Sequence, residues 1–271
     1  MRLGAPIFDK YESGEEWALL CQKYGYRAAY SPINNKNELN RKDEFIKAAK
    51  KYDIVIAEVG AWSNPMSINP EERKNAIEHC KNQLFIADEM GANCCVNISG
   101  NLGEGRWDGH SYKNFSSEAF DLIVETTRDI IDSVKPARTY YTLEMMPWMM
   151  PYNQRSYLSL INAIARERFA VHLDIVNIIK SPTRYYRTAD IIKSCIARLG
   201  KYIKSIHVKD MIMFDDMPVH INEIIPGKGN FHHKCLIEEV RKLDENIPLM
   251  LEHLASKEEY LEAGEYIKSL F

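Results

Sequence analysis

The sequence predicts an α/β fold in the form of a single (β/α)8 barrel that takes up residues 1–271. First, short apolar runs rich in β-formers recur along the chain with longer amphipathic stretches between them. Second, several of these runs, such as Ile54-Val-Ile-Ala57, are apolar almost throughout, as in parallel strands covered on both faces. Third, no linker or change of composition divides the chain. The eight predicted strands are 2–8, 27–33, 54–62, 93–99, 139–147, 169–177, 205–211 and 248–254.

Helix signals fill the segments between these strands. Ser13, Asn69 and Ser116 each precede acidic residues in the manner of a helix N-cap. Gly91 stands where the helix opened by Asn69 is expected to stop, just before the next strand. The last helix is expected over 257–271. Strands and helices therefore alternate along the whole sequence, as the barrel requires.

Composition and charge exclude several classes of protein. The 35 basic and 38 acidic residues give a formal net charge of -3, which lacks the basic excess typical of proteins that bind nucleic acid. No run approaches the roughly 18 apolar residues of a membrane span, and the N-terminus has no secretory signal pattern. The six cysteines form no C-x-x-C pair, so we expect reduced thiols in a cytoplasmic protein. Neither nucleic acid nor a membrane is an expected partner.

Polar side chains stand near the C-terminal ends of several predicted strands, although the interior of such a barrel is normally apolar. The C-terminal strand ends of a barrel meet at its active-site mouth, so these side chains are expected to converge there. Buried carboxylates need a partner, and several in one place indicate a cation. The residues concerned are Glu58, Asn97, Glu144, His172, Asp174, Asn177, His207, Lys209, Asp210, Glu252 and His253.

Alternation along each strand narrows this set, because residues two apart face the same way. His207 shares a face with Lys209, whereas Asp210 faces elsewhere. Three carboxylates and one imidazole then form a candidate set of metal ligands for one divalent ion. Mn²⁺ is favoured, and Mg²⁺, Co²⁺ or Zn²⁺ also suit such ligands. The candidate ligands are Glu144, Asp174, His207 and Glu252.

Over essentially its whole length the chain resembles the sugar phosphate isomerase/epimerase family of xylose-isomerase-like TIM barrels. The matching pieces are Glu58-Val-Gly-Ala-Trp62, Glu144-Met-Met-Pro147, Asp174-Ile-Val-Asn177, His207-Val-Lys-Asp210, Pro226-Gly-Lys-Gly229 and Glu252-His-Leu254. The resemblance implies that Glu144, Asp174, His207 and Glu252 hold one divalent metal. It also implies that Glu144 and Glu252 are the catalytic acid and base, and that the chain associates as a dimer or tetramer.

The implied reaction removes a proton from the carbon next to the carbonyl of a small-molecule sugar or cyclitol, through an enediolate that the metal stabilises. Isomerisation or epimerisation is the leading outcome. An inosose-type dehydratase, or another enolate-forming lyase, begins with the same step and is the alternative. A hydrolase of the endonuclease IV type would need three metals and a histidine where this chain has Asn177. A non-catalytic sugar-binding barrel would have no physical reason to keep four buried ligands.

The candidate substrate-binding residues are Glu58, Trp62, Asn97, Asn177 and Lys209. The first three are expected at the mouth, where the indole of Trp62 packs against sugar C–H bonds or against a covering loop. Asn177 is a hydrogen-bond partner for a sugar hydroxyl. Lys209 has two interpretations: a contact to an anionic group of the substrate, or an internal ion pair that orients a metal-binding histidine.

Overall fold

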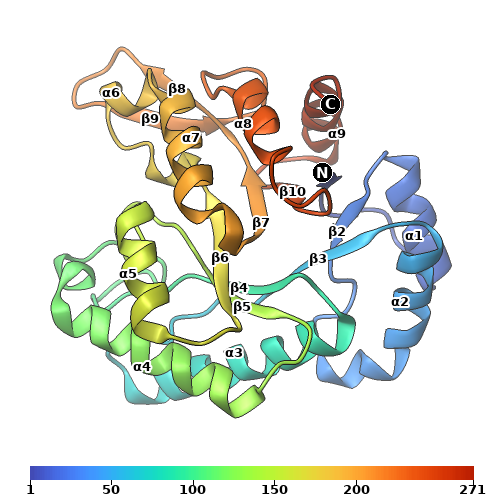
Figure 1. Ribbon diagram of the computed structural model, residues 1–271, viewed down its shortest axis with the longest axis horizontal. Coiled ribbons are helices and arrows are strands. Elements are labelled where there is room, and N and C mark those ends of the chain that lie inside the picture. Colours follow the sequence, from blue (N-terminus) through green and yellow to red (C-terminus); the bar gives the residue numbers. More distant parts are fainter.

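The computed structural model describes the whole chain, residues 1–271, and its main sheet is a closed barrel (Figure 1). The barrel strands are β1 (Arg2–Gly4), β2 (Ala28–Tyr30), β3 (Val55–Gly60), β4 (Cys94–Asn97), β5 (Tyr140–Glu144), β6 (Phe169–Asp174), β7 (Ile203–Val208) and β10 (Pro248–Leu251). Neighbouring strands are parallel and follow the order β1-β10-β7-β6-β5-β4-β3-β2. Each overlaps one of the eight predicted runs, which confirms the (β/α)8 barrel.

Helices connect the strands around the outside of the barrel (Figure 1). They are α1 (Gly14–Lys23), α2 (Lys42–Lys51), α3 (Pro70–Met90), α4 (Ser117–Val134), α5 (Gln154–Ile164), α6 (Pro182–Tyr185), α7 (Thr188–Leu199), α8 (His233–Val240) and α9 (Lys257–Lys268), with 3-10 turns at η1 (Lys36–Arg41), η2 (Tyr112–Phe115), η3 (Val176–Ile178) and η4 (Gly200–Tyr202). Ser13, Asn69 and Ser116 cap α1, α3 and α4 through their side chains, as the sequence predicts. None of the helices combines the length and the apolar character needed to cross a membrane.

The apolar core lies between the barrel and its helices, whereas the inside of the barrel is largely polar. The outer core is one cluster of 62 buried residues. Inside the barrel, Ala28, Ala57 and Met250 form a separate cluster of only three. The side chains that meet across the rest of the interior carry charge or hydrogen-bonding groups. Polar groups therefore line the inside of this barrel, where most barrels have apolar side chains.

An irregularity in β3 turns Glu58 into the barrel. The pairing of β2 with β3 skips from Ile56 to Glu58, so Ala57 is an extra residue in the strand. Simple alternation would face Glu58 the same way as Ile56, which packs in the outer core. The extra residue reverses this direction, and Glu58 meets His172 of β6 across the barrel.

A hairpin that the sequence analysis did not predict stands between β7 and α8. Its strands, β8 (Asp210–Phe214) and β9 (His220–Ile224), pair antiparallel. The predicted run 205–211 joins the end of β7 to the start of β8, because no turn residue separates them. Asp210 anchors the base of the hairpin, since its buried carboxylate accepts hydrogen bonds from the backbone N–H groups of Met211, Gly227, Gly229 and Phe231. Asp210 therefore makes no ion pair with Lys209.

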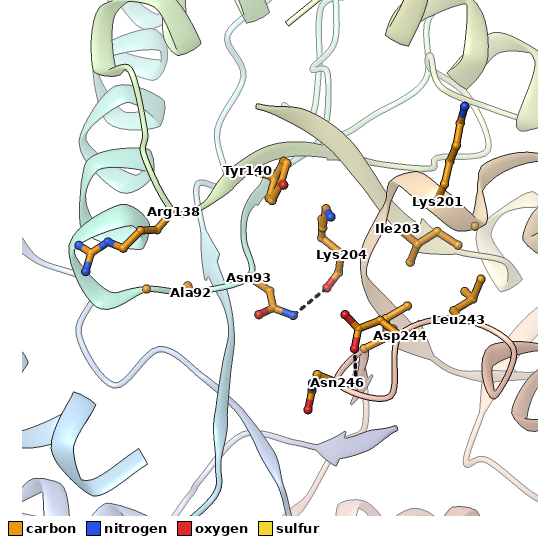
Figure 2. A pocket seen from close by; sticks show the side chains of 13 residues that line it. Ala92, Asn93, Arg138, Tyr140, Lys201, Ile203, Lys204, Leu243, Asp244 and Asn246 are labelled. Carbon is orange, nitrogen blue, oxygen red and sulfur yellow. Dashed lines mark hydrogen bonds between the residues drawn. The ribbon is translucent and has the colours of Figure 1, made fainter. Parts of the chain in front are cut away.

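A cavity of about 410 Å³ opens at the N-terminal ends of the strands (Figure 2). Asn93 Nδ2 donates a hydrogen bond of 3.3 Å to the backbone oxygen of Lys204, and Arg138 points away from the other side chains in Figure 2. The one carboxylate of this cavity, on Asp244, accepts a hydrogen bond from the backbone N–H of Asn246. No charged groups converge there, as expected for the stabilising end of a barrel.

Candidate metal centre and active site

Four side chains from adjacent strands converge at the mouth of the barrel, the end where the C-termini of the strands meet. Glu144 ends β5, Asp174 ends β6, His207 lies near the end of β7, and Glu252 directly follows β10. From His207 Nδ1, the closest carboxylate oxygens of the other three lie at 3.0 Å (Glu252), 3.5 Å (Glu144) and 3.7 Å (Asp174). One donor atom from each residue lies within 4.8 Å of the others. The structure thus brings together the four candidate metal ligands.

The donor atoms of this cluster fit a divalent cation. Asp174 Oδ2 and Glu252 Oε2 are buried and share the single ammonium group of Lys209, at 2.8 Å each, and neither ring nitrogen of His207 makes a well-directed hydrogen bond. One ammonium shared between two buried carboxylates leaves part of their charge unbalanced, and a coordinated cation would balance it. A set rich in oxygen with one imidazole also matches the preferences of Mn²⁺ and Mg²⁺.

Lys209 places its ammonium group among the same carboxylates. Nζ lies 2.8 Å from Asp174 Oδ2 and 2.8 Å from Glu252 Oε2, and the side chain is 2% exposed. Of the two interpretations from the sequence, this contact corresponds to an internal ion pair, formed with the strand-end carboxylates rather than with Asp210. When His207 is neutral and the three carboxylates are ionised, one ammonium balances only one of the three negative charges, so the cluster in this protonation state favours a cation.

Burial and neighbouring charges separate the pKa values of these groups. Burial raises the pKa of Glu144, and the Glu252 carboxylate raises it further. Burial also opposes ionisation of Glu252, but His207 and Lys209 outweigh it and lower the pKa of Glu252 to about 2. Burial disfavours a charged His207, yet Glu252 and Glu58 outweigh this effect and raise its pKa well above the ordinary value. Without a metal, Glu144 and His207 therefore hold protons more readily than usual.

Asn177, on the turn η3 after β6, orients one of the candidate ligands. Its Nδ2 donates a hydrogen bond of 2.8 Å to Glu144 Oε1 and one of 3.1 Å to the backbone oxygen of Met145. Its backbone N–H donates to Asp174 Oδ1 at 3.1 Å. The amide of Asn177 donates a hydrogen bond to the candidate metal ligand Glu144. It stands where an endonuclease IV-like centre requires a metal-binding histidine.

A cavity of about 480 Å³ at the mouth includes Glu144 and Glu252 in its lining. Three partly exposed indoles wall it: Trp62 from the loop after β3, Trp107 from the loop after β4 and Trp148 from the loop after β5. Trp62 thus lies at the mouth, as expected. Indole faces of this kind pack against the apolar face of a ring. The full lining is Trp62, Ile98, Trp107, Asp108, Glu144, Met146, Pro147, Trp148, Asn177, Glu223, Glu252 and His253.

Glu58 lies inside the barrel and not at the mouth. It is 1% exposed and takes no part in the cavity lining, because the extra residue in β3 turns it inward. Its Oε1 lies 3.1 Å from His172 Nε2 and accepts a hydrogen bond from Ser205 Oγ. Its Oε2 lies 3.4 Å from His207 Nε2. The expectation that Glu58 stands at the mouth is therefore wrong.

Asn97 also lies away from the cavity, so its predicted place at the mouth is wrong. Its side chain faces α3, where Nδ2 lies 3.3 Å from Cys80 Sγ and Oδ1 accepts a hydrogen bond of 3.2 Å from the backbone N–H of Ser63. Strand alternation explains this direction, because Asn97 faces the same way as Cys95, which packs in the outer core.

Two further residues lie at the mouth: His253, which is among the polar strand-end residues expected there, and Glu223, which is not among them. Glu223 of β9 lies 3.3 Å from Lys209 Nζ, and its Oε2 lies 2.9 Å from His253 Nδ1. Both Glu223 and His253 line the cavity. A hairpin pattern would have indicated Glu223: the apolar run 211–214 and the run 220–224, with isoleucine at 221 and 224, flank the turn-forming segment Asp215-Asp-Met-Pro218.

The sequence also matches a known family over most of its length. A family model described as "Xylose isomerase-like TIM barrel" matches residues 19–270. The chain belongs to this family. No curated protein sequence matches the chain significantly.

Solved structures of this family's fold superpose over nearly the whole chain. A probable 3-DHS dehydratase from Bacillus anthracis has a TM-score of 0.74 and 16% identity, covering 100% of this chain and 98% of that one. The 3-keto-D-glucoside 4-epimerase of E. coli has a TM-score of 0.70 and 13% identity, covering 99% of each chain. A xylose isomerase-like TIM barrel protein from Mycobacterium smegmatis, in complex with magnesium, has a TM-score of 0.67 and 14% identity, covering 99% and 96%. At these identities the likeness shows the fold alone.

Proposed function

We propose that this protein is a divalent-metal-dependent isomerase or epimerase that moves a proton at the carbon next to the carbonyl of a sugar or cyclitol. The proposal depends on the position of Glu144 and Glu252, which belong to the candidate metal set and also line the cavity at the mouth. A glutamate that both binds the metal and lines the cavity can act on a substrate bound at the metal. The likeness in fold to a 3-keto-D-glucoside 4-epimerase supports this class of reaction.

Glu144, Asp174, His207 and Glu252 would hold the ion, and we favour Mn²⁺ over Mg²⁺, Co²⁺ and Zn²⁺. A divalent ion in this position supplies Lewis-acid stabilisation of the negative charge that develops on substrate oxygens. The magnesium complex of the Mycobacterium smegmatis barrel supports a divalent ion in a protein of this fold.

The two glutamates reach the cavity from β5 and from the end of β10, so they approach the substrate from different strands. One carboxylate takes the proton from the substrate carbon, and the other group, as a carboxylic acid, returns a proton to that carbon. Return to the opposite face inverts the carbon and leaves the two glutamates with exchanged protonation states. Asn177 holds Glu144 in place for this transfer through its hydrogen bond to Oε1.

The charge of the cavity favours a neutral substrate. Its lining contains four carboxylates, one imidazole and no lysine or arginine. The nearby ammonium of Lys209 is buried against Asp174 and Glu252. A phosphate group entering this cavity would meet like charge and no cationic lysine or arginine, since the two charges of the proposed ion only match those of Glu144 and Glu252. We therefore propose an unphosphorylated, polyhydroxylated ketone, whose ring packs against Trp62 and whose hydroxyl groups contact Asn177, whereas Lys209 stays in its internal ion pair.

A dehydratase of a sugar or cyclitol is the second candidate. The likeness in fold to a probable 3-DHS dehydratase supports it. Such a reaction begins with the same proton abstraction, after which the hydroxyl on the next carbon leaves with the proton returned by the acid, as water. The products separate the two candidates, because only the dehydratase releases water and leaves a carbon–carbon double bond.

The test is solvent deuterium uptake by a panel of neutral ketohexoses, 3-ketoglucosides and inososes, incubated with the Mn²⁺-loaded protein in D₂O. The proposal expects deuterium at the carbon next to the carbonyl, and no uptake with Glu144→Gln or Glu252→Gln. Glu262→Gln on α9 is the matched control, since Glu262 is exposed and pairs with Lys228 outside the cavity. Undiminished uptake in either site variant would remove Glu144 and Glu252 as the acid–base pair.

We also infer that the protein works in the reducing cytoplasm as a dimer or tetramer. All six cysteines are free and buried, and burial raises the pKa values of the Cys21 and Cys195 thiols to about 12. Thiols of this kind pack as small apolar groups and need no disulfide. Light scattering on the purified protein measures the oligomeric state.

A further inference from the structure

The two ring nitrogens of His207 face different groups. Nδ1 makes the closest approach to Glu252, Glu144 and Asp174, the candidate metal ligands. Nε2 makes the closest approach to Glu58, at 3.4 Å from Oε2. His207 therefore stands between the candidate metal centre and a carboxylate buried inside the barrel.

A histidine can bind a metal through Nδ1 only if that nitrogen carries no proton. The neutral ring then carries its proton on Nε2, and a buried N–H needs an acceptor. The oxygen of Glu58 lies on that side. An acceptor there would fix both which nitrogen is protonated and how the ring is turned.

Contacts to Oε1, the carboxylate oxygen that faces away from His207, hold Glu58 in this position. Oε1 accepts a hydrogen bond from Ser205 Oγ and lies 3.1 Å from His172 Nε2. Oε2 has no hydrogen-bond partner of its own in the absence of a metal. The rings of His172 and His207 also pack edge to face, with centroids 4.1 Å apart, so both imidazoles contact this carboxylate and each other. One carboxylate oxygen is therefore anchored and the other is free to accept from His207.

We infer that Glu58 is a positioning residue: it accepts the Nε2 proton of His207 and so directs the Nδ1 lone pair of His207 toward Glu144, Asp174 and Glu252. The inference rests on the metal site of the proposed function. It gives Glu58 a task that needs no contact with substrate, in agreement with its place inside the barrel. It also explains why a charged group is kept at a buried position of β3.

The alternative interpretation is that Glu58, His172 and His207 bind a second metal ion. Glu58, His172 and His207 also have donor atoms within 4.8 Å of one another. The hydrogen bonds at Oε1 favour the positioning role, because the oxygen that faces Ser205 is already satisfied. A count of ions per chain separates the two arrangements.

The experiment measures Mn²⁺ affinity and ion stoichiometry by calorimetry, without substrate, for the wild type, Glu58→Gln, Glu58→Asp and Ser205→Ala. Glu58→Gln removes the charge at nearly constant volume. Glu58→Asp keeps the charge but shortens the side chain by one methylene, which withdraws it from His207. Ser205→Ala keeps the Glu58 charge but removes a hydrogen bond that holds its other oxygen. Glu262→Gln, measured in the same way, is the matched control, because Glu262 is exposed on α9 and pairs with Lys228. Circular dichroism verifies that each variant folds.

The inference expects one ion per chain, a loss of affinity of about 10- to 100-fold in both Glu58 variants, a smaller loss in Ser205→Ala, and a change of less than about threefold in Glu262→Gln. Nitrogen-15 NMR of the Mg²⁺-loaded wild type should also show a slowly exchanging proton on His207 Nε2, which exchanges faster in Glu58→Asp. Affinity within about threefold of wild type in both folded Glu58 variants would overturn the inference. Two ions per wild-type chain, or none, would overturn it as well. If one ion binds and its affinity depends on Glu58, but the protein catalyses no deuterium exchange, the inference stands and only the proposed function fails.

Discussion

Asn177 Nδ2 donates a hydrogen bond of 2.8 Å to Glu144 Oε1, so an amide on the turn after β6 sets the direction of a carboxylate at the end of β5. The same amide group also bonds to the backbone oxygen of Met145, which fixes its own orientation. Asn177 lines the cavity together with Glu144. This pair therefore joins the candidate metal centre to the surface that a substrate would touch.

Replacing Asn177 by alanine is expected to lower kcat by about 10- to 100-fold, which corresponds to one lost hydrogen bond to a charged group. Metal affinity should change less, because Glu144 remains in the ligand set. Steady-state kinetics beside Mn²⁺ titration measures the two effects separately. A variant with wild-type kcat would show that the hydrogen bond is not needed for proton transfer.

Asn97→Ala is expected to act on stability alone. Asn97 bonds to Ser63 and lies against Cys80 on the side of the strand that faces α3, away from the cavity. Its loss should reduce the free energy of unfolding by about 1–3 kcal/mol, measured by urea denaturation. The kcat/KM of the folded variant should stay within about twofold of wild type. A large kinetic loss without a loss of stability would return Asn97 to the substrate site.

The site residues differ in how far the sequence could predict their positions. Glu144, Asp174 and His207 end strands of strongly apolar character, so their convergence at the mouth followed from the barrel topology. The orientation of Glu58 depends on the extra residue Ala57, which an alternation pattern cannot detect. Glu223 comes from a hairpin outside the repeating strand–helix units, so counting eight strands left it without a place.

Trp62→Ala is expected to raise KM by about two- to tenfold with little change in kcat, because an indole face against a ring contributes binding energy of about 0.5–1.5 kcal/mol. Trp62 lines the cavity but belongs to neither the ligand set nor the acid–base pair. Tyr186→Ala is the control, since Tyr186 is an exposed aromatic residue outside the cavity. Equal KM values for Trp62→Ala and wild type would place the substrate elsewhere in the cavity.

Metal binding is expected to tighten as pH rises through the neutral range. The pKa values of Glu144 and His207 are both raised in the metal-free protein, so protons occupy groups that a metal needs free. Binding must then release these protons, and a lower proton concentration favours the complex. Calorimetry in buffers of different ionisation enthalpy counts the released protons, with about one to two expected. An affinity that does not change between about pH 6 and about pH 8 would contradict this linkage.

The most direct test of the account is the metal content of the protein purified without chelator and reconstituted with Mn²⁺, measured by elemental mass spectrometry beside Asp174→Asn and His207→Gln. Both variants replace one strong donor by a weaker, neutral amide at nearly constant volume, and Glu262→Gln serves as the control. The account predicts one divalent ion per chain in the wild type and the control, and almost none in the two site variants. A wild type without metal, or a full complement of metal in either site variant, would contradict it.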